Sequence, residues 1–391
     1  MARSRIGRSP RLGNLRVERV TDRRSLKTFV RLPAPLYRDD PAWVAPLMFE
    51  RLGILDKNKN PFFEHAVAEY WIAYREGQPV GRISAQVDDL AQKMHGEGTG
   101  HFGFIEAPED PAVFEALFDT AESWLRERGM TRSVGPFNLS INEESGLLVD
   151  GFEHPPMIMT PHALPYYGAS LEKLGYRKAK DLRAYEVDAA RTLPDSVRRL
   201  LRRAAGDRRL RLRNLRMSRL QADFRIIRDI FNDAWAENWG FLPFTEAEIS
   251  KMCTDLRPLL RAHSCKIAYW NGEPAAFMLI LPDLNSLISD LGGRLLPFGW
   301  AKLGWRVLRG RYPRARVPLL GVRREHQNRL PGAFMALLMI DSLHVDWRKR
   351  HRLERGEMSW ILEDNKAMKG ILDAIQSVHY KTYRIYEKSL E

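Results

Sequence analysis

A basic loop between an apolar run and a helix-like run is the part of the sequence best suited to bind an anion. The apolar residues Val317–Val322 are followed by the basic stretch Arg323–Arg329. Where a strand leads through a loop into a helix, free N–H groups and the positive end of the helix dipole lie at the turn. We expect Arg324 and Arg329 to add charge there and Gly332 to allow close backbone approach, which predicts a site for a phosphorylated cofactor.

Two carboxylates, Glu363 and Asp283, are candidates for a general base. Glu363 follows a second strand-like run, Glu357–Leu362, and Asp283 lies in the turn-like stretch Pro282–Asn285. An alkylamine is mostly protonated at neutral pH, so a site that acylates an amine needs a base. Each carboxylate also has a structural interpretation, because a carboxylate at a helix start is favoured by the helix dipole and Asp is common in turns.

The elements that must position these residues occur twice in the chain. Residues 72–79 and 267–274 are identical at five of eight positions, and residues 171–187 align without gaps to residues 372–388. In each copy an apolar run meets a Gly-containing turn and a second run, which predicts a β-hairpin. Further strands alternate with helices, so we expect an α+β class with a mixed sheet.

The two copies differ at the loop that precedes their central helix. We expect this helix at residues 111–128 in the first copy, capped by Asp110, and at residues 332–349 in the second. The first-copy loop carries Glu106, Glu109 and Asp110, which would repel a phosphate. The sequence therefore predicts that only the second copy binds the cofactor.

Length and the repeat predict two domains, residues 15–190 and 208–391, after a disordered basic arm at residues 1–14. The net charge of +13 indicates an anionic partner, which is a nucleic acid, a membrane surface or a phosphorylated cofactor. The chain has no apolar run of the roughly 18 residues that span a bilayer and no secretory signal. Its two cysteines match no zinc spacing, and we expect a cytoplasmic protein without a metal.

The basic loop resembles the cofactor turn of the GNAT superfamily of acyl-CoA N-acyltransferases, whose signature is Arg/Gln-x-x-Gly-x-Gly/Ala. The chain matches this signature at Arg329 and Gly332 and departs from it at Phe334. The resemblance covers nearly the whole chain as two GNAT-like units, the first degenerate, and it implies acyl-CoA as a substrate. It places the acyl-CoA contacts, including the N–H groups that stabilise an oxyanion, on Leu320, Gly321, Val322, Arg324, Arg329, Gly332, Ala333 and Asn365.

Four other stretches, residues 36–44, 135–143, 239–243 and 282–285, resemble a bacterial group of long tandem proteins that includes ceramide synthases. This resemblance implies transfer of a long acyl chain to the amine of a sphingoid-type lipid. The candidates for acceptor contacts are Trp239, Phe241 and Asn285, and the two aromatic residues have a core role as the alternative.

Residues 291–316 form an unusual segment between two strands. A helix there would carry Phe298, Ala301, Trp305 and Leu308 on one face and Lys302, Arg306 and Arg309 on another. Basic residues beside interfacial tryptophans are typical of a helix on a membrane surface, which here would be the inner membrane. The alternative is a helix packed on its own domain.

Three other functions remain open at this point. One is a GNAT N-acetyltransferase for a small molecule or protein amine, and another is a non-catalytic binding protein. The third is an aminoacyl-tRNA-dependent Fem-type transferase, with the basic stretch Arg198–Arg219 as its footprint. Core-like leucines interrupt that stretch and no RNA-binding motif accompanies it, so a nucleic-acid partner is not favoured.

Overall fold

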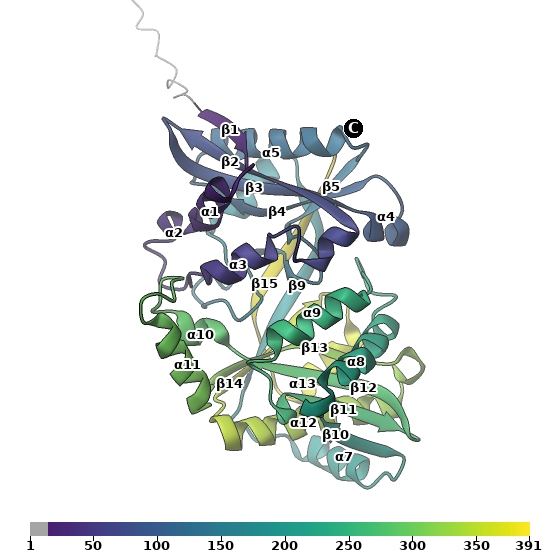
Figure 1. The fold of residues 1–391 in the computed structure, drawn as a ribbon. Helices are drawn as coiled ribbons and strands as arrows, with labels where there is room; N and C mark the ends of the chain where they lie inside the picture. The colour runs from purple at the N-terminus through teal and green to yellow at the C-terminus, as the bar shows by residue number, and fades with distance from the viewer. Residues whose placement is uncertain (1–14) are drawn as a thin grey trace, which may run out of the picture.

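The structure is a computed structural model that describes residues 15–391, so the predicted arm at residues 1–14 lies outside the described residues. The described chain forms one large mixed sheet with helices on both of its faces (Figure 1). The predicted α+β class is therefore confirmed.

The first half of the chain supplies nine strands and six helices among the described residues. Its strands are β1 (Leu15–Arg19), β2 (Ala66–Arg75), β3 (Gln78–Asp88), β4 (Thr99–Glu106), β5 (Arg132–Gly135), β6 (Phe137–Asn138), β7 (Glu144–Ser145), β8 (Leu147–Asp150) and β9 (Arg177–Asp188). Its helices are α1 (Arg23–Arg31), α2 (Pro33–Leu36), α3 (Met48–Ile54), α4 (Asp89–His95), α5 (Pro111–Arg126) and α6 (Tyr166–Lys173).

The second half repeats this order with fewer strands. Its strands are β10 (Leu210–Asn214), β11 (Cys265–Trp270), β12 (Glu273–Pro282), β13 (Arg314–Val322), β14 (Arg355–Leu362) and β15 (Val378–Ser389). Its helices are α7 (Asp195–Ala205), α8 (Leu220–Ala234), α9 (Glu246–Leu256), α10 (Leu284–Ile288), α11 (Gly299–Arg309), α12 (Leu330–His351) and α13 (Lys366–Ala374).

Local signals in the sequence account for these elements. The two predicted hairpins are β2–β3 and β11–β12, and in each the turn residue before Gly, Glu76 or Asn271, has a positive φ. Asp110 caps α5 as predicted, accepting a hydrogen bond from the N–H of Ala112 at 3.0 Å. The predicted helix in residues 291–316 is α11.

The halves exchange their last strands. The sheet order is β1-β2-β3-β4-β5-β15-β9-β14-β13-β12-β11-β10, with β8 also beside β15. The last strand of the first half, β9, thus pairs with β14 of the second half, and the C-terminal strand β15 pairs with β5 of the first. The two exchanged strands pair with each other in the middle of the sheet.

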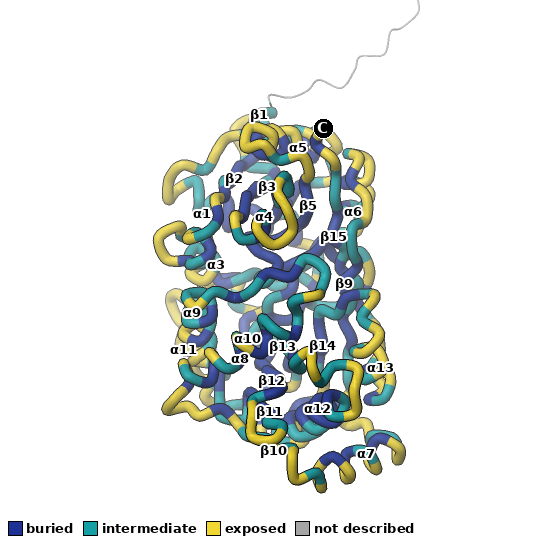
Figure 2. The backbone as a smooth tube through the Cα atoms, turned by 90° about the vertical axis from the view of Figure 1, so that its right-hand side faces the viewer, coloured by how far each residue is buried: buried dark blue, intermediate teal, exposed yellow. Residues whose placement is uncertain are grey.

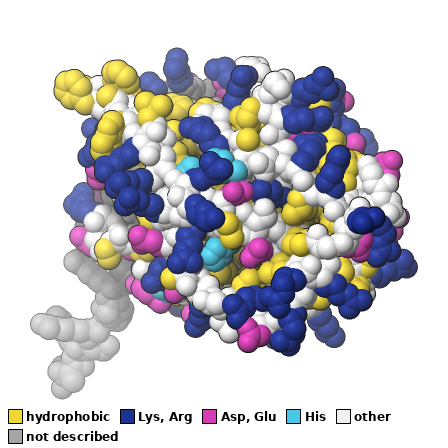
Figure 3. Space-filling model, turned by 90° about the horizontal axis from the view of Figure 1, so that it is seen from below, with side chains coloured by type: hydrophobic (Ala, Val, Ile, Leu, Met, Phe, Trp, Pro, Cys, Tyr) yellow, Lys and Arg dark blue, Asp and Glu magenta, His cyan; other side chains and the backbone are white. Residues whose placement is uncertain are grey.

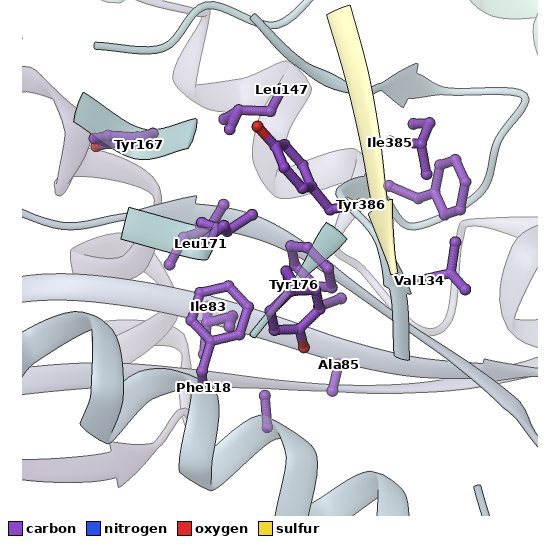
Figure 4. Close-up of a cluster of buried hydrophobic side chains, with 14 of the residues drawn as sticks. Ile83, Ala85, Phe118, Val134, Leu147, Tyr167, Leu171, Tyr176, Ile385 and Tyr386 are labelled. Carbon is purple, nitrogen blue, oxygen red and sulfur yellow. The ribbon is translucent and has the colours of Figure 1, made fainter. Parts of the chain in front are cut away.

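Side chains from the C-terminal strand complete the core of the first half. Ile385 and Tyr386 are buried among side chains of the first half that include Ile83, Phe118 and Leu171 (Figure 4). Figure 2 shows the buried backbone running through the centre of both halves, with the exposed residues on the outer helices and turns. The predicted limits at residues 190 and 208 divide the sequence repeats, whereas the sheet joins the two halves across those limits.

Candidate active site

The strands β13 and β14 separate in the middle of the second half. They pair in parallel only over Arg314–Val317 and Arg355–Met358. Pro318, which has no N–H to donate to a ladder, follows the last pair directly. Beyond that pair the edge of β13 that faces β14 has no strand partner among residues 15–391, and a cavity opens between the two strands.

This cavity is open to solvent, and about 980 Å³ of unfilled space, which includes solvent at the mouth, lies among its lining residues. Val317 and Met358 lie at its base, where the strands last pair. Its other lining residues come from both strands and β12, from α9 and α13, from the loops beside α8 and α13, from the loop between β6 and β7, and from Met159. They are mostly apolar, and include Trp235, Phe244, Met252, Leu256, Leu279, Leu281, Leu319, Leu320, Trp360, Ile361, Leu362 and Met368.

The two charged side chains of the lining, Arg316 and Glu143, differ in whether they already form hydrogen bonds within the protein. The guanidinium of Arg316 is buried and donates to Ser359 Oγ at 2.7 Å and to the carbonyls of Ile158 and Met159 at 2.7 and 2.9 Å. Glu143 also lines the cavity, and its carboxylate accepts no hydrogen bond from the described residues. Burial, with Glu144 and Glu248 nearby, raises the pKa of Glu143 to about 8.

The corresponding opening in the first half is filled by its own chain. The strands β4 and β5 pair in parallel only over Thr99–His101 and Arg132–Val134. Beyond this, the N–H of Phe104 donates to Asn138 Oδ1 at 2.7 Å, and Gln86 Nε2 donates to the carbonyl of Phe137, also at 2.7 Å. A Cβ on Gly103 would lie 1.8 Å from the Phe137 oxygen, so the filling segment is in close contact with β4.

The first half also occupies its helix terminus. Asp110 caps α5 and pairs with Arg75, whereas α12 begins at Leu330 without a side-chain cap. From the sequence we expected Glu106 to point into the loop before α5, but it does not. It is buried and accepts hydrogen bonds from the hydroxyls of Tyr37 and Tyr167 at 2.8 and 2.9 Å, because burial of a carboxylate requires such partners.

The loop before α12 contains several residues that we expected to contact acyl-CoA. Some of them are free to do so, and others are bound to other parts of the protein. A Cβ on Gly332 would lie 2.3 Å from the His326 oxygen, so this glycine allows the loop to fold tightly over the helix start. The side chain of Arg324 is drawn away to α8 and its end, where it pairs with Asp233 at 3.5 Å and Glu237 at 3.1 Å. The N–H of Ala333 donates to the Arg329 carbonyl, and the Arg329 side chain is exposed.

Among the other predicted cofactor residues, Leu320 and Asn365 line the cavity. Asn365 caps α13, and its Oδ1 accepts from the N–H of Met368 at 3.0 Å. Gly321 is buried against Phe277, and the carbonyl of Val322 accepts from Gln327 Nε2 at 2.8 Å. Gly321 and Val322 shape the loop but do not line the cavity.

The two carboxylates predicted as bases lie outside the cavity lining. Glu363 accepts from Lys178 Nζ at 2.7 Å and from the N–H of Asp181 at 3.1 Å, and so fastens β9. Asp283 is buried and accepts from the N–H of Ile158 at 3.1 Å. Burial, opposed by the charge of Arg314, raises the pKa of Asp283 to about 6.

The predicted acceptor residues also have other contacts. Asn285 donates to the carbonyls of Pro156 and Met157 at 3.0 and 3.1 Å, so Asn285 and Asp283 together hold the segment that crosses from the first half. Phe241 is buried against Phe231, and Trp239 packs on the core of the first half. Trp235 and Phe244, which also pack against Phe231, line the cavity instead.

Sequence reasoning did not find Glu143 as a cavity residue. The stretch 135–143 resembles the tandem group, but its sequence indicates no chemical role for Glu143. Nothing local could show that this loop reaches into the second half.

Comparison with known proteins agrees with this geometry. No protein-family model matches the chain. The chain is 45% identical over 366 residues to the bacterial ceramide synthase of Caulobacter vibrioides (strain NA1000 / CB15N), covering 93% of this chain and 95% of that protein. It is 43% identical over 377 residues to the protein YghO of Escherichia coli (strain K12), covering 94% of each.

The fold is similar to that of a tandem GNAT protein from the clavulanic acid biosynthesis pathway, with a TM-score of 0.59 at 13% identity over 97% of this chain and 99% of that chain. A GCN5-related N-acetyltransferase from Sphaerobacter thermophilus has a TM-score of 0.51 at 13% identity over 96% of each chain. Similarity at this level concerns the fold, while the curated relatives define the family. The chain therefore belongs to the family of the bacterial ceramide synthase and is an acyl-CoA-dependent N-acyltransferase of two GNAT-like units.

Proposed function

We propose that the chain transfers a long acyl group from acyl-CoA to the amine of a sphingoid-type lipid, in the cavity between β13 and β14. The observation that carries this proposal is the mostly apolar lining of that cavity. Each buried CH₂ of a hydrocarbon chain contributes about 0.8 kcal/mol, so such a lining favours a lipid substrate over an acetyl group. The name of the Caulobacter relative supports the same substrate class.

A second apolar cavity adds room for hydrocarbon. It is open to solvent and is lined by Met278 and Ile280 of β12 and by residues of α12. The neighbouring residues Leu279 and Leu281 line the first cavity, so the two cavities lie on opposite faces of β12. Val317 and Met358 border both cavities.

The acyl-CoA would bind at the open end of the same two strands. Its phosphates would lie at the uncapped start of α12, near Arg329 and Gly332, and its pantetheine arm between β13 and Asn365. Free N–H groups at a helix start favour an anion there. The filled opening and capped α5 of the first half support a single acyl-CoA site, in the second half.

A membrane surface is the proposed source of the lipid substrate, and α11 the element that meets it. The helix and the turn before it expose Leu296 (80%), Phe298 (78%), Trp300 (60%), Trp305 (59%) and Leu308 (83%). Through Leu303 and Val307, α11 also packs on the core of its own half, as the packed-helix alternative expects, so it is the opposite, exposed face that we assign to the membrane. Among residues 15–391, no helix has the length and apolar character needed to cross a bilayer.

The basic residues beside α11 differ from those expected. Lys302 and Arg306 both pair with Asp290, so one of their two positive charges is balanced within the protein. Three other arginines, Arg309, Arg311 and Arg352, lie near one another at the end of the helix. The positive charges of Arg352 and Arg309 lower the pKa of Arg311. Figure 3 shows many Lys and Arg side chains on the lower face of the molecule. We therefore assign the contact with anionic head groups to Arg309, Arg311 and Arg352.

The substrate class is tested by turnover with matched pairs. Purified protein is given palmitoyl-CoA or acetyl-CoA with sphinganine or with a short soluble alkylamine, and products are quantified by mass spectrometry. We expect kcat/KM for palmitoyl-CoA with sphinganine to exceed that for acetyl-CoA by about 100-fold or more, the equivalent of burying a few CH₂ groups. Equal use of acetyl-CoA and the soluble amine would instead favour the N-acetyltransferase alternative.

A further inference from the structure

Glu143 belongs to the first half of the chain but lines the cavity of the second. It lies in the loop between β6 and β7, and its own N–H donates to the carbonyl of Ser140 at 3.1 Å. The loop is tied to the second half beside it, because Asn142 Nδ2 donates to the carbonyl of Leu242 at 3.1 Å. Gly240 lies against Ile141, where a Cβ would come within 2.9 Å. The fold thus holds this carboxylate at the wall that faces β13 and β14.

The charged neighbours of Glu143 are engaged with one another. In the same β6–β7 hairpin, Glu144 pairs with Arg51 of α3 and accepts a hydrogen bond from Asn138 Nδ2 at 2.8 Å. On α9, Glu248 contacts His65 Nε2 at 3.2 Å, and the other ring nitrogen of His65 contacts Asp88 at 2.9 Å. Glu50 of α3 is the remaining carboxylate close enough to act on Glu143.

These pairings leave one carboxylate facing the cavity without a partner among residues 15–391. Arg51 is the only cation among its strongest charged neighbours, and that guanidinium is already paired with Glu144. An unpaired carboxylate in such surroundings is costly for the fold, and such groups are common where a catalytic acid or base is needed. A structural role would instead require a hydrogen bond or an ion pair.

We propose that Glu143 is the general base of the acyl transfer, so that the first half supplies a catalytic residue to the site of the second. This inference rests on the proposed location of the reaction in the cavity between β13 and β14. It extends the proposed function by giving the half without an open cofactor site a direct part in the chemistry.

In the proposed acyl transfer, two protons leave the acceptor nitrogen. Glu143 takes one proton from the ammonium group of the acceptor, and the neutral nitrogen then attacks the thioester carbonyl. The C–N bond forms, the C–S bond breaks, and the electron pair leaves with the sulfur of CoA. The second proton of the nitrogen passes to the thiolate, and Glu143 returns its proton to solvent. Its pKa of about 8 lies between those of a free carboxyl group and an alkylammonium group, about 4.3 and 10.4, so it can take up and release the proton at neutral pH.

The decisive variant is Glu143→Gln, which keeps the shape of the side chain and removes the base. We expect kcat to fall by about 100-fold or more, the usual contribution of general-base catalysis. The wild-type kcat should rise with pH through an apparent pKa near 8, since the ionised carboxylate is the active form. In the Glu143→Gln variant, kcat should no longer rise with pH in this range. Glu143→Asp, which keeps an ionisable group, should keep a pH-dependent rate at lower activity.

Stability and cofactor binding separate this role from a structural one. Because the fold holds the pKa of Glu143 above that of a free carboxyl group, its ionisation disfavours the folded state as pH rises. The Tm of Glu143→Gln should therefore equal or exceed that of the wild type, and its acyl-CoA affinity by calorimetry should be unchanged. Glu153→Gln, at an exposed position a few residues further along the chain, is the matched control and should behave as the wild type.

All variants are assayed with whichever acyl-CoA and amine the wild type turns over fastest. A preference for acetyl-CoA would then contradict the lipid proposal without affecting this test. A kcat for Glu143→Gln within tenfold of the wild type would overturn the inference. So would a loss of activity that is accompanied by a lower Tm or by weaker acyl-CoA binding.

Discussion

At the scale of single residues, the arginines of the loop before α12 show how partners decide which charge can reach a ligand. Arg323 Nε donates to the carbonyl of Pro274 at 2.8 Å, and Arg324 pairs with Asp233 and Glu237. Among the described residues, Arg329 has neither a hydrogen-bond nor an ion-pair partner for its side chain, and it precedes the uncapped helix start. We therefore expect Arg329 to be the arginine of this loop that binds the phosphates of acyl-CoA.

Replacing Arg329 by Glu should weaken acyl-CoA binding by about 1–3 kcal/mol, the value of a lost charge-assisted hydrogen bond. Isothermal titration calorimetry measures the change. Arg348→Glu makes the same charge change on an exposed residue near the far end of α12, roughly 27 Å away, and should leave the affinity unchanged. Equal affinities for the wild type and Arg329→Glu would remove this loop from the site.

At the scale of elements, α11 is the clearest departure from the packing of the other helices. Its outward face carries large apolar side chains that full burial would stabilise by about 1.5–3 kcal/mol each for Leu or Phe. Arg309 lies over the ring of Trp305 at 5.0 Å, which keeps a cation beside an interfacial aromatic residue. This arrangement suits a helix that lies at the boundary between head groups and acyl chains.

Changing both Trp300 and Trp305 to Ser should reduce binding to anionic vesicles at least tenfold, about 1.4 kcal/mol, because two apolar contacts with the bilayer are lost. Cosedimentation with phosphatidylglycerol vesicles measures the binding, which should also weaken as salt is added. The double variant Val67→Ser with Val378→Ser alters two exposed apolar residues elsewhere and serves as the control. If the tryptophan variant binds vesicles as well as this control does, α11 is not the membrane contact.

At the scale of the whole molecule, the exchanged strands make each half depend on the other. The fully buried Ile385 stands on the C-terminal strand but contacts the core of the first half. The β6–β7 loop, in turn, reaches the cavity of the second half, and Arg316 and Asp283 of the second half hold the segment that includes Ile158. Cooperative unfolding of the whole sheet is the expected consequence.

Replacing Ile385 by Ala should cost about 2–5 kcal/mol of the free energy of unfolding, the usual effect of a large-to-small change in a core. Hydrogen exchange should speed up in β5 and α5 of the first half, far from residue 385 in sequence. Val378→Ala, on an exposed position of the same strand, should change neither quantity. Faster exchange confined to the second half would argue against a shared core.

The sequence by itself determined the features that depend on near neighbours along the chain. The hairpins with their Gly turns, the Asp110 cap and the helix at residues 299–309 each follow from residues a few positions apart, and the repeat follows from matching short stretches of this kind. The resemblance to the GNAT superfamily and to its tandem group followed from short stretches as well, and the curated relatives confirm the family.

Only the tertiary structure decided which distant segments meet. The strands β9 and β15 have similar sequences, so the pattern of either one suits β5 or β14, and pairing across the whole sheet selects the exchanged arrangement. The same long-range packing ties Glu363 to Lys178 and Asp283 to Ile158, and it brings Glu143 to a cavity whose strands lie more than 170 positions further along the chain. A carboxylate's role depends on what surrounds it in space, and for these three residues the decisive neighbours come from the other half of the molecule.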